Sequence, residues 1–144
     1  MPPLEEAGAD KWKVLVVDDE PNIVHLISEI LGRTHKYELA SAYDGFEAGI
    51  QVVKFCPDLV ILDLMMPNID GFKVCKNIKS SPETKHVKIL VITGYATDEN
   101  VQKIMEYGAD YCMSKPLKID ELTKIVDDLF AGRHSNVHSV SLTT

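Results

Sequence analysis

Long apolar runs are missing from this 144-residue sequence. No stretch approaches the roughly 18–20 consecutive apolar residues that a membrane-spanning helix needs. Its first residues, Met1–Glu6, are acidic and contain no apolar core of the kind found in secretion signals. We therefore expect a cytoplasmic protein that does not associate with a membrane.

Cysteine is also scarce, with only Cys56, Cys75 and Cys112 in the chain. The number is odd, the spacing is wide, and no CxxC pair or histidine stands at zinc-ligand spacing. These features exclude a disulfide framework and a zinc site of the usual kind. We expect three buried, reduced thiols.

Positive charge is in deficit, since 15 Lys and Arg stand against 22 Asp and Glu, for a net charge of −7. Binding to duplex nucleic acid depends on lysine and arginine neutralising phosphates. The sequence shows no basic cluster, so direct nucleic-acid binding is not expected. The 45% hydrophobic content is typical of a soluble globular protein, and the length suits one domain.

Three short runs, 14–17, 59–62 and 89–92, are continuously apolar and consist mostly of β-branched residues or leucine. Continuous runs indicate strands that are covered on both faces, as in the centre of a parallel sheet. Two weaker segments, Tyr37–Ala42 and Asp110–Ser114, fit edge strands of the same sheet.

The segments between these strands have helical periodicity. The apolar residues expected to face the core are Ile23, Leu26, Ile27, Ile30 and Leu31; Phe46, Gly49, Ile50 and Val53; Val74, Cys75 and Ile78; Val101, Ile104 and Met105; and Leu122, Ile125, Val126 and Leu129. Asp44 and Thr97 stand where side chains cap helix N-termini. Five alternating β-α units predict an open three-layer α/β sandwich over 11–131, between flexible segments 1–10 and 132–144.

Polar side chains follow the strands directly. Asp18 and Asp19 come after the first run, Asp63 after the second, Thr93 after the third and Lys115 after the last strand. Taken singly, each is explained as a turn former, a helix cap or a surface charge. Because ligands of open α/β sheets bind at the carboxyl ends of the strands, their joint occurrence favours a site there.

Three clustered aspartates repel one another, and a hard divalent cation relieves that repulsion. Mg²⁺ prefers oxygen ligands, and one or two carboxylates together with phosphate oxygens usually suffice. An incoming phosphoryl group would meet the metal, an ammonium group and a hydroxyl group. These residues therefore predict Mg²⁺-dependent phosphoryl transfer.

The longer motifs around these residues resemble the receiver domain of bacterial two-component response regulators, including the chemotaxis-type single-domain receivers. The resemblance covers about 11–130 and rests on the motifs at Val16–Pro21, Asp63–Gly71, Thr93–Tyr95 and Lys115–Leu117. It implies a flavodoxin-like, doubly wound (βα)5 fold with a parallel five-stranded sheet in the order 2-1-3-4-5.

The resemblance also implies roles at the site. Asp63 would be the phosphoacceptor, supplied by a sensor histidine kinase or a phosphotransfer protein. Asp19, Asp63 and the backbone carbonyl of Met65 would hold Mg²⁺, with Asp18 acting through a metal-bound water. The chain would be a signalling domain, not a conventional enzyme, and would promote its own phosphorylation and dephosphorylation.

Two further residues would contact the phosphoryl group in a receiver. Lys115 would bridge to the phosphoryl oxygens and Thr93 would hydrogen-bond the acyl phosphate. The Lys115–Pro116 peptide bond is expected to be cis, which only an X-Pro bond adopts at low cost.

One position departs from the family pattern. Receivers usually carry an aromatic residue three positions before the lysine, but Cys112 stands there and the aromatic residue is Tyr111. Because strand side chains alternate between faces, Tyr111 should point the opposite way unless a local bulge restores the geometry. The departure leaves phosphorylation intact and puts the usual route of output in doubt.

Phosphorylation is expected to change the conformation of the Thr97–Phe130 face, which would bind a downstream protein or a second copy as a homodimer. The alternative is a phosphorylation-independent interaction module of the same fold. A phosphatase of the haloacid-dehalogenase type is disfavoured because Met65 stands where its second acid would be. A flavin carrier is disfavoured because Asp18–Pro21 would repel a phosphate.

Overall fold

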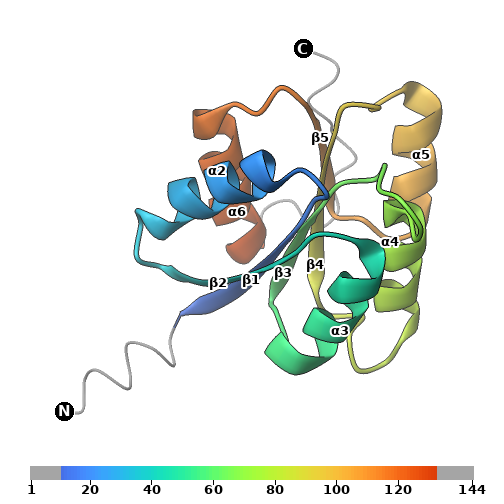
Figure 1. The fold of residues 1–144 in the computed structure, drawn as a ribbon, viewed down its shortest axis with the longest axis horizontal. Helices are drawn as coiled ribbons and strands as arrows, with labels where there is room; N and C mark the ends of the chain where they lie inside the picture. The colour runs from blue at the N-terminus through green and yellow to red at the C-terminus, as the bar shows by residue number, and fades with distance from the viewer. Residues whose placement is uncertain (1–10, 133–144) are drawn as a thin grey trace.

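The computed structural model describes residues 11–132 and shows a five-stranded parallel sheet (Figure 1). The strands are β1 (Trp12–Val17), β2 (Tyr37–Ala42), β3 (Leu59–Leu62), β4 (Lys88–Thr93) and β5 (Tyr111–Ser114). They pair in the order β2-β1-β3-β4-β5, which confirms the predicted order and places both weaker segments at the edges. The segments 1–10 and 133–144, where flexible ends are predicted, lie outside the described residues.

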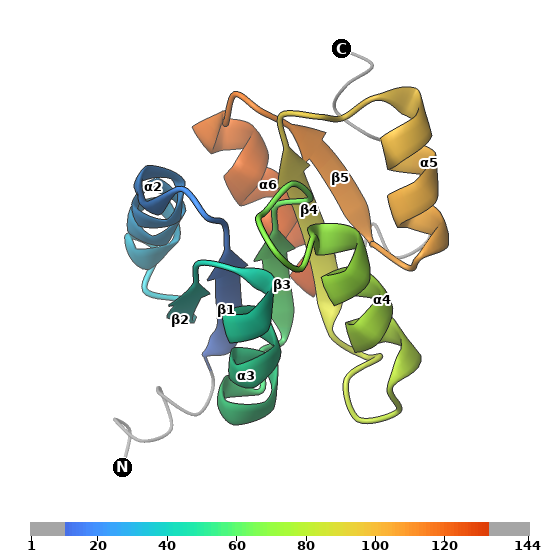
Figure 2. The same cartoon turned by 45° about the vertical axis from the view of Figure 1, so that its right-hand side comes forward.

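Five helices cover the two faces of the sheet, as the β-α alternation predicts (Figure 2). They are α2 (Pro21–Gly32), α3 (Gly45–Phe55), α4 (Gly71–Ser80), α5 (Asp98–Glu106) and α6 (Ile119–Phe130). α2 and α6 lie on one face, and α3, α4 and α5 lie on the other. None of the helices within 11–132 has the length and apolar character needed to cross a bilayer.

The apolar runs are buried on both faces, as expected for central strands. Val14 and Val16 belong to the core beneath α2 and α6, whereas Leu15 and Val17 belong to the core beneath α3, α4 and α5. Burying a side chain of this size stabilises the fold by about 1.5–3 kcal/mol relative to leaving it exposed. The predicted apolar face of α6, at Leu122, Ile125, Val126 and Leu129, is buried as well.

The core-facing stripe predicted for α3 is wrong. Phe46 is 69% exposed and Val53 72% exposed, and the side that faces the sheet carries Gly45, Ala48 and Val52 instead. The helix lies too close to its neighbours for larger residues on that side: a Cβ atom on Gly45 would stand 2.5 Å from the carbonyl oxygen of Ile69. Periodicity could not choose between two apolar sides of one helix.

A smaller error of the same kind occurs in α2. Leu26 is 37% exposed, while Val24, which the predicted stripe omits, is buried. Of the remaining predicted residues, Ile27, Ile30 and Leu31 are buried as expected, and Ile23 is half-buried against the same core.

Both predicted helix caps are confirmed. The Asp44 side chain accepts a hydrogen bond from the Glu47 backbone N–H at 2.7 Å. The Thr97 hydroxyl accepts one from the Asn100 backbone N–H at 3.1 Å. Each bond satisfies an N–H group that has no partner within its own helix.

The cysteine prediction is correct for Cys75 and Cys112, which are buried, and wrong for Cys56, which is exposed. Cys56 ends α3 in the left-handed conformation, with φ of 55°. The helix therefore stops there, before Pro57, and the side chain lies outside the core.

Candidate functional site

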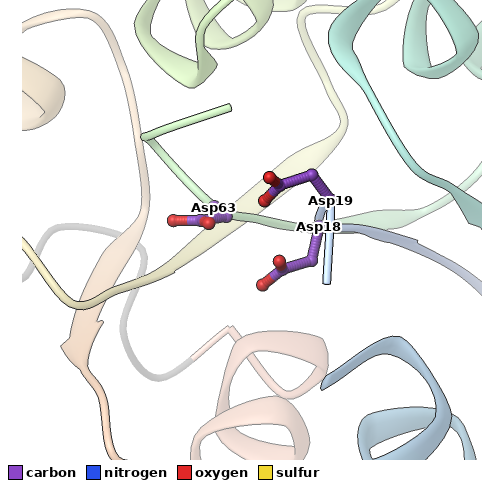
Figure 3. Close-up of side chains that lie close together, drawn as sticks. All are labelled: Asp18, Asp19 and Asp63. Atoms are coloured by element: carbon purple, nitrogen blue, oxygen red, sulfur yellow. The ribbon is translucent and has the colours of Figure 1, made fainter. Parts of the chain in front are cut away.

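Three aspartates meet at the carboxyl edge of the sheet, as the strand ends predict (Figure 3). Asp18 and Asp19 follow β1 and Asp63 follows β3, and the register pairs Val17 with Leu62, so the two strands end side by side. Each aspartate offers one oxygen, and these oxygens lie within 4.8 Å of one another. Asp18 and Asp63 are buried and Asp19 is exposed, which leaves the cluster open to solvent on one side.

Lys115 directly follows β5, an edge strand of the sheet, and its side chain extends into this cluster. Its Nζ lies 3.1 Å from Asp18 Oδ2, 3.1 Å from Glu20 Oε1 and 3.6 Å from Asp63 Oδ2. The Lys115 backbone N–H donates to the Thr93 carbonyl at 2.9 Å, which holds the lysine beside the end of β4. The Lys115–Pro116 bond that follows is cis, as expected.

Glu20 is a partner of Lys115 that sequence reasoning missed. It is the N-cap residue of α2, and its side chain makes no capping bond and reaches Lys115 instead. Its only sequence signal is its place directly after the two aspartates, where an acid is equally well explained as favouring the helix dipole.

Thr93 and Met65 both act on Asp63. Thr93 is fully buried, and its side chain lowers the pKa of the Asp63 carboxyl group. Its hydroxyl oxygen also accepts a bond from the Tyr95 N–H at 3.1 Å. The Met65 backbone N–H donates to Asp63 Oδ1 at 3.4 Å. The structure therefore brings together all the site residues that the sequence predicts.

Burial dominates the electrostatics of the site. It raises the pKa of Asp63 from 3.8 to about 6, aided by repulsion from Asp18 and opposed by attraction to Lys115. Burial also raises the pKa of Asp18. For Lys115, burial by itself would lower the pKa, but attraction to Asp63 and bonds to Glu20 and Asp18 outweigh it and raise the pKa. At neutral pH, Asp63 is therefore mostly ionised, at a cost in free energy.

The donor set fits a hard divalent cation. The three side chains offer carboxylate oxygens within 4.8 Å of one another, and burial and repulsion from Asp18 raise the pKa of Asp63. Mg²⁺ takes oxygen ligands and keeps several waters, so a partly open acidic cluster suits it. Asp18, Asp19 and Asp63 are the side chains that could hold it.

The loop that follows Asp63 is held by a close backbone approach. The Gly71 N–H donates to the Leu64 carbonyl at 2.8 Å, which brings the start of α4 against the end of β3. A Cβ atom on Gly71 would clash with the Asp63 carbonyl oxygen and lie 2.6 Å from Leu64 Cα. Only glycine fits here, and its position fixes the loop beside the acid.

Tyr111 points to the opposite face of the sheet from Cys112, as its one-residue offset from the usual aromatic position predicts. β5 pairs with β4 in an unbroken register, Leu90 with Tyr111 and Val91 with Cys112, so no bulge restores the usual geometry. Tyr111 belongs to the core beneath α2 and α6, whereas Cys112 belongs to the core beneath α3, α4 and α5. The position that usually carries the aromatic residue therefore holds a small, buried thiol.

An open parallel α/β sheet with carboxylates, a lysine and a threonine at its carboxyl edge defines the class of protein to which this chain belongs. Residues 14–127 match the model of the response regulator receiver domain, and the chain is a member of that family. Receivers are signalling domains that accept a phosphoryl group in two-component systems, and they interact with histidine kinases or phosphotransfer proteins.

Relatives and solved structures agree with this assignment. The chain is 33% identical to sporulation initiation phosphotransferase F of Bacillus subtilis, over 79% of this chain and 90% of that protein. It is 30% identical to the DNA-binding dual master transcriptional regulator RpaA of Synechocystis, over 87% of this chain but only 55% of that protein. Several curated relatives are therefore much longer than this chain.

Among solved structures, the signal receiver domain of a DNA-binding response regulator from Colwellia psychrerythraea superimposes with a TM-score of 0.80. That structure is 34% identical to this chain and is covered over 99% of its length, with 84% of this chain aligned.

Proposed function

We propose that Asp63 is the residue of this receiver that becomes phosphorylated. The observation that supports the assignment is its burial at the end of β3, with Asp18 and Asp19 beside it and the Lys115 ammonium 3.6 Å away. A buried carboxylate flanked by further acids suits a role as a nucleophile in a site that also receives a cation.

The reaction would be a transfer between two side chains. An ionised oxygen of Asp63 attacks the phosphorus of a phosphohistidine on the kinase or phosphotransfer protein, and a new O–P bond forms as the P–N bond breaks. The imidazole leaves with the electron pair and takes a proton from solvent. Mg²⁺, when bound by Asp19, Asp63 and the Met65 carbonyl, with Asp18 acting through a water, supplies charge neutralisation for the phosphoryl oxygens.

The chain's own residues position and neutralise the group. Lys115, which contacts Asp18, Glu20 and Asp63, is placed to exchange part of these contacts for a phosphoryl oxygen. The buried hydroxyl of Thr93, which already acts on the pKa of Asp63, would donate to the acyl phosphate. The same arrangement would admit water for dephosphorylation, so the domain would promote both steps on itself.

We propose that the contact between Thr93 and the phosphoryl group controls the binding of a partner. This residue ends β4, directly before the Thr97–Phe130 face that contains α5, β5 and α6. A phosphoryl group that accepts a hydrogen bond from Thr93 would shift this face between two conformations. The shift would control the binding of a downstream protein or a second copy. We further propose that this exchange takes place in the cytoplasm, as the resemblance to two-component receivers implies.

Intact mass spectrometry tests the assignment. After incubation with acetyl phosphate and Mg²⁺, the wild-type chain should gain about 80 Da, the mass of one phosphoryl group. Neither Asp63→Asn protein nor wild type treated with EDTA should gain it. Asp70→Asn is the matched control, because Asp70 lies in the same loop but only caps α4, and asparagine caps equally well.

An adduct on Asp63→Asn protein, or its loss in the Asp70→Asn control, would contradict the assignment of Asp63. If the wild type gains no mass from acetyl phosphate or from a phosphorylated histidine kinase, the chain is instead a phosphorylation-independent module of the same fold.

A further inference from the structure

Helix α3 presents an apolar side to solvent in addition to the side that it buries. Ala48 and Val52 pack against the sheet, but Phe46, Ile50 and Val53 form a second stripe at helical spacing that lies exposed. A helix that is apolar on two sides is normally covered on both. Large apolar side chains that gather on one exposed surface mark a site of interaction.

This stripe borders a groove between α3 and α4, which lie next to each other in Figure 2. The groove has a volume of about 660 Å³. Val74 and Ile78 of α4 form its second wall, Ile69 also lines it, and Asn77 and Ser81 supply polar groups. Apolar walls on two neighbouring helices with a polar rim suit a partner helix that inserts side chains at i, i+4 and i+7.

Lysines occur in the lining of this groove and along the segment that forms its second wall, although the whole chain carries a net charge of −7. Among residues 11–132, Lys54 is the only charged residue that lines the groove. Residues 71–88 contain five lysines and one acid, a local excess of positive charge in a chain that is acidic overall. The lysines are Lys73, Lys76, Lys79, Lys85 and Lys88.

Two of these lysines, Lys73 and Lys85, are exposed and available to a partner. Lys76 is exposed too, but its Nζ lies over the ring of Tyr107 at the end of α5, 5.7 Å from the ring centroid. Lys79 is not available, because it donates to the Val87 carbonyl and pairs with Asp110. Charge complementarity therefore favours an acidic partner and disfavours a symmetric dimer through this face, which would bring Lys54 and the exposed lysines against themselves. The apolar centre of the surface distinguishes it from a nucleic-acid site, where phosphate contacts dominate.

We propose that the α3–α4 groove binds an amphipathic helix of a partner protein, with apolar side chains in the groove and acidic side chains along its flanks. The groove lies outside the Thr97–Phe130 face and uses none of the residues assigned to phosphorylation. The two assignments therefore stand or fall separately.

Two peptide libraries on phage test this proposal with the full chain as bait. Both present 18-residue helices with Leu, Ile or Phe at i, i+4 and i+7; one carries Glu and Asp on the flanks and the other carries Lys and Arg. Peptides should be enriched from the acidic library, and fluorescence anisotropy should show affinities that fall as NaCl rises from 50 to 500 mM.

Substitutions locate the bound peptide. Val53→Glu and Lys54→Glu should each weaken binding about tenfold, a size typical of central interface positions. The matched controls Ile119→Glu and Lys118→Glu change an exposed apolar residue and an exposed lysine near the start of α6 and should leave binding unchanged. Because Val53 and Lys54 are exposed, both variants should keep the wild-type circular dichroism and the acetyl phosphate adduct.

The proposal fails if the basic library is enriched instead, if neither is, or if the control substitutions weaken binding as much as Val53→Glu does. It also fails if sedimentation shows a dimer that Val53→Glu abolishes, which would make a second copy the occupant. Competition by a short DNA duplex would point to nucleic acid. If Val53→Glu shifts the NMR signals of residues 1–10 or 133–144, the chain's own ends occupy the groove.

Discussion

Replacing Asp63 by asparagine should stabilise the metal-free protein at neutral pH. The wild type must keep a buried carboxylate ionised beside Asp18, and these two effects raise the pKa of Asp63 from 3.8 to about 6 although Lys115 attracts it. Asparagine has nearly the same shape and no charge to bury. The variant should therefore lose the proposed phosphorylation and gain stability.

The expected gain follows from the pKa difference. Each pKa unit corresponds to 1.36 kcal/mol, so ionising Asp63 in the folded state costs about 3 kcal/mol more than in the unfolded state. Asparagine recovers less than this because its amide must still find partners in a buried site, so we expect a gain of about 2 kcal/mol in the free energy of unfolding.

The pH dependence has a defined sign. The folded state binds a proton on Asp63 more tightly than the unfolded state does, so this residue's favourable contribution is complete below about pH 4 and is lost as pH rises to about 6. Urea unfolding in EDTA should therefore show nearly equal stabilities for wild type and Asp63→Asn at pH 4. A gap should open between pH 4 and 6 and stay constant to pH 8.

Adding Mg²⁺ should reduce the stability difference between Asp63→Asn and wild type, since only the wild type has the full ligand set. A Mg²⁺ concentration of 100 times Kd would stabilise the wild type by about 2.7 kcal/mol. The control Asp70→Asn should match the wild type within about 0.5 kcal/mol. If Asp63→Asn protein in EDTA is less stable than wild type at pH 7, the attraction of Asp63 to Lys115 outweighs its burial and the reasoning is wrong.

Three other predictions concern the scaffold. Gly71→Ala should lower the free energy of unfolding by at least about 2 kcal/mol in urea titrations, because a Cβ atom would clash with the end of β3; unchanged stability would mean that α4 moves freely. Thr97→Ala removes the α5 cap and should cost about 0.5–2 kcal/mol, whereas Thr97→Ser should restore most of it. A thiol reagent at pH 8 should label Cys56 in the native protein and react with Cys75 and Cys112 only after unfolding. The reason is that burial raises the pKa of both buried thiols to about 12. Rapid labelling of all three in the native protein would show that Cys75 and Cys112 are not buried in the core.

The strands and the acidic cluster were predictable because both depend on local order in the sequence. β3 (Leu59–Leu62) has the predicted bounds, since a short, continuous apolar run of β-branched residues and leucine is typical of a strand covered on both faces. Asp18 and Asp63 had to meet once their strands were neighbours in a parallel sheet. The direction of the Tyr111 side chain could also be predicted, because side chains of a strand alternate between the two faces of the sheet.

The errors arise where one local pattern is compatible with two arrangements. α3 has apolar residues on two sides, and only the close approach of Gly45 to Ile69 decides which side is buried. Glu20 could equally have served the dipole of α2, and its bond to Lys115 depends on a strand end 95 residues away in the chain.

The sequence by itself determined the order of the elements, the fold and the identities of the residues at the carboxyl edge, because periodicity and strand-end position are properties of neighbouring residues. Only the tertiary structure decided how far burial raises the pKa of Asp63, which acids share Lys115, and that Phe46 and Val53 face solvent beside α4. These properties depend on distances between segments far apart in the chain, and no local pattern specifies such distances.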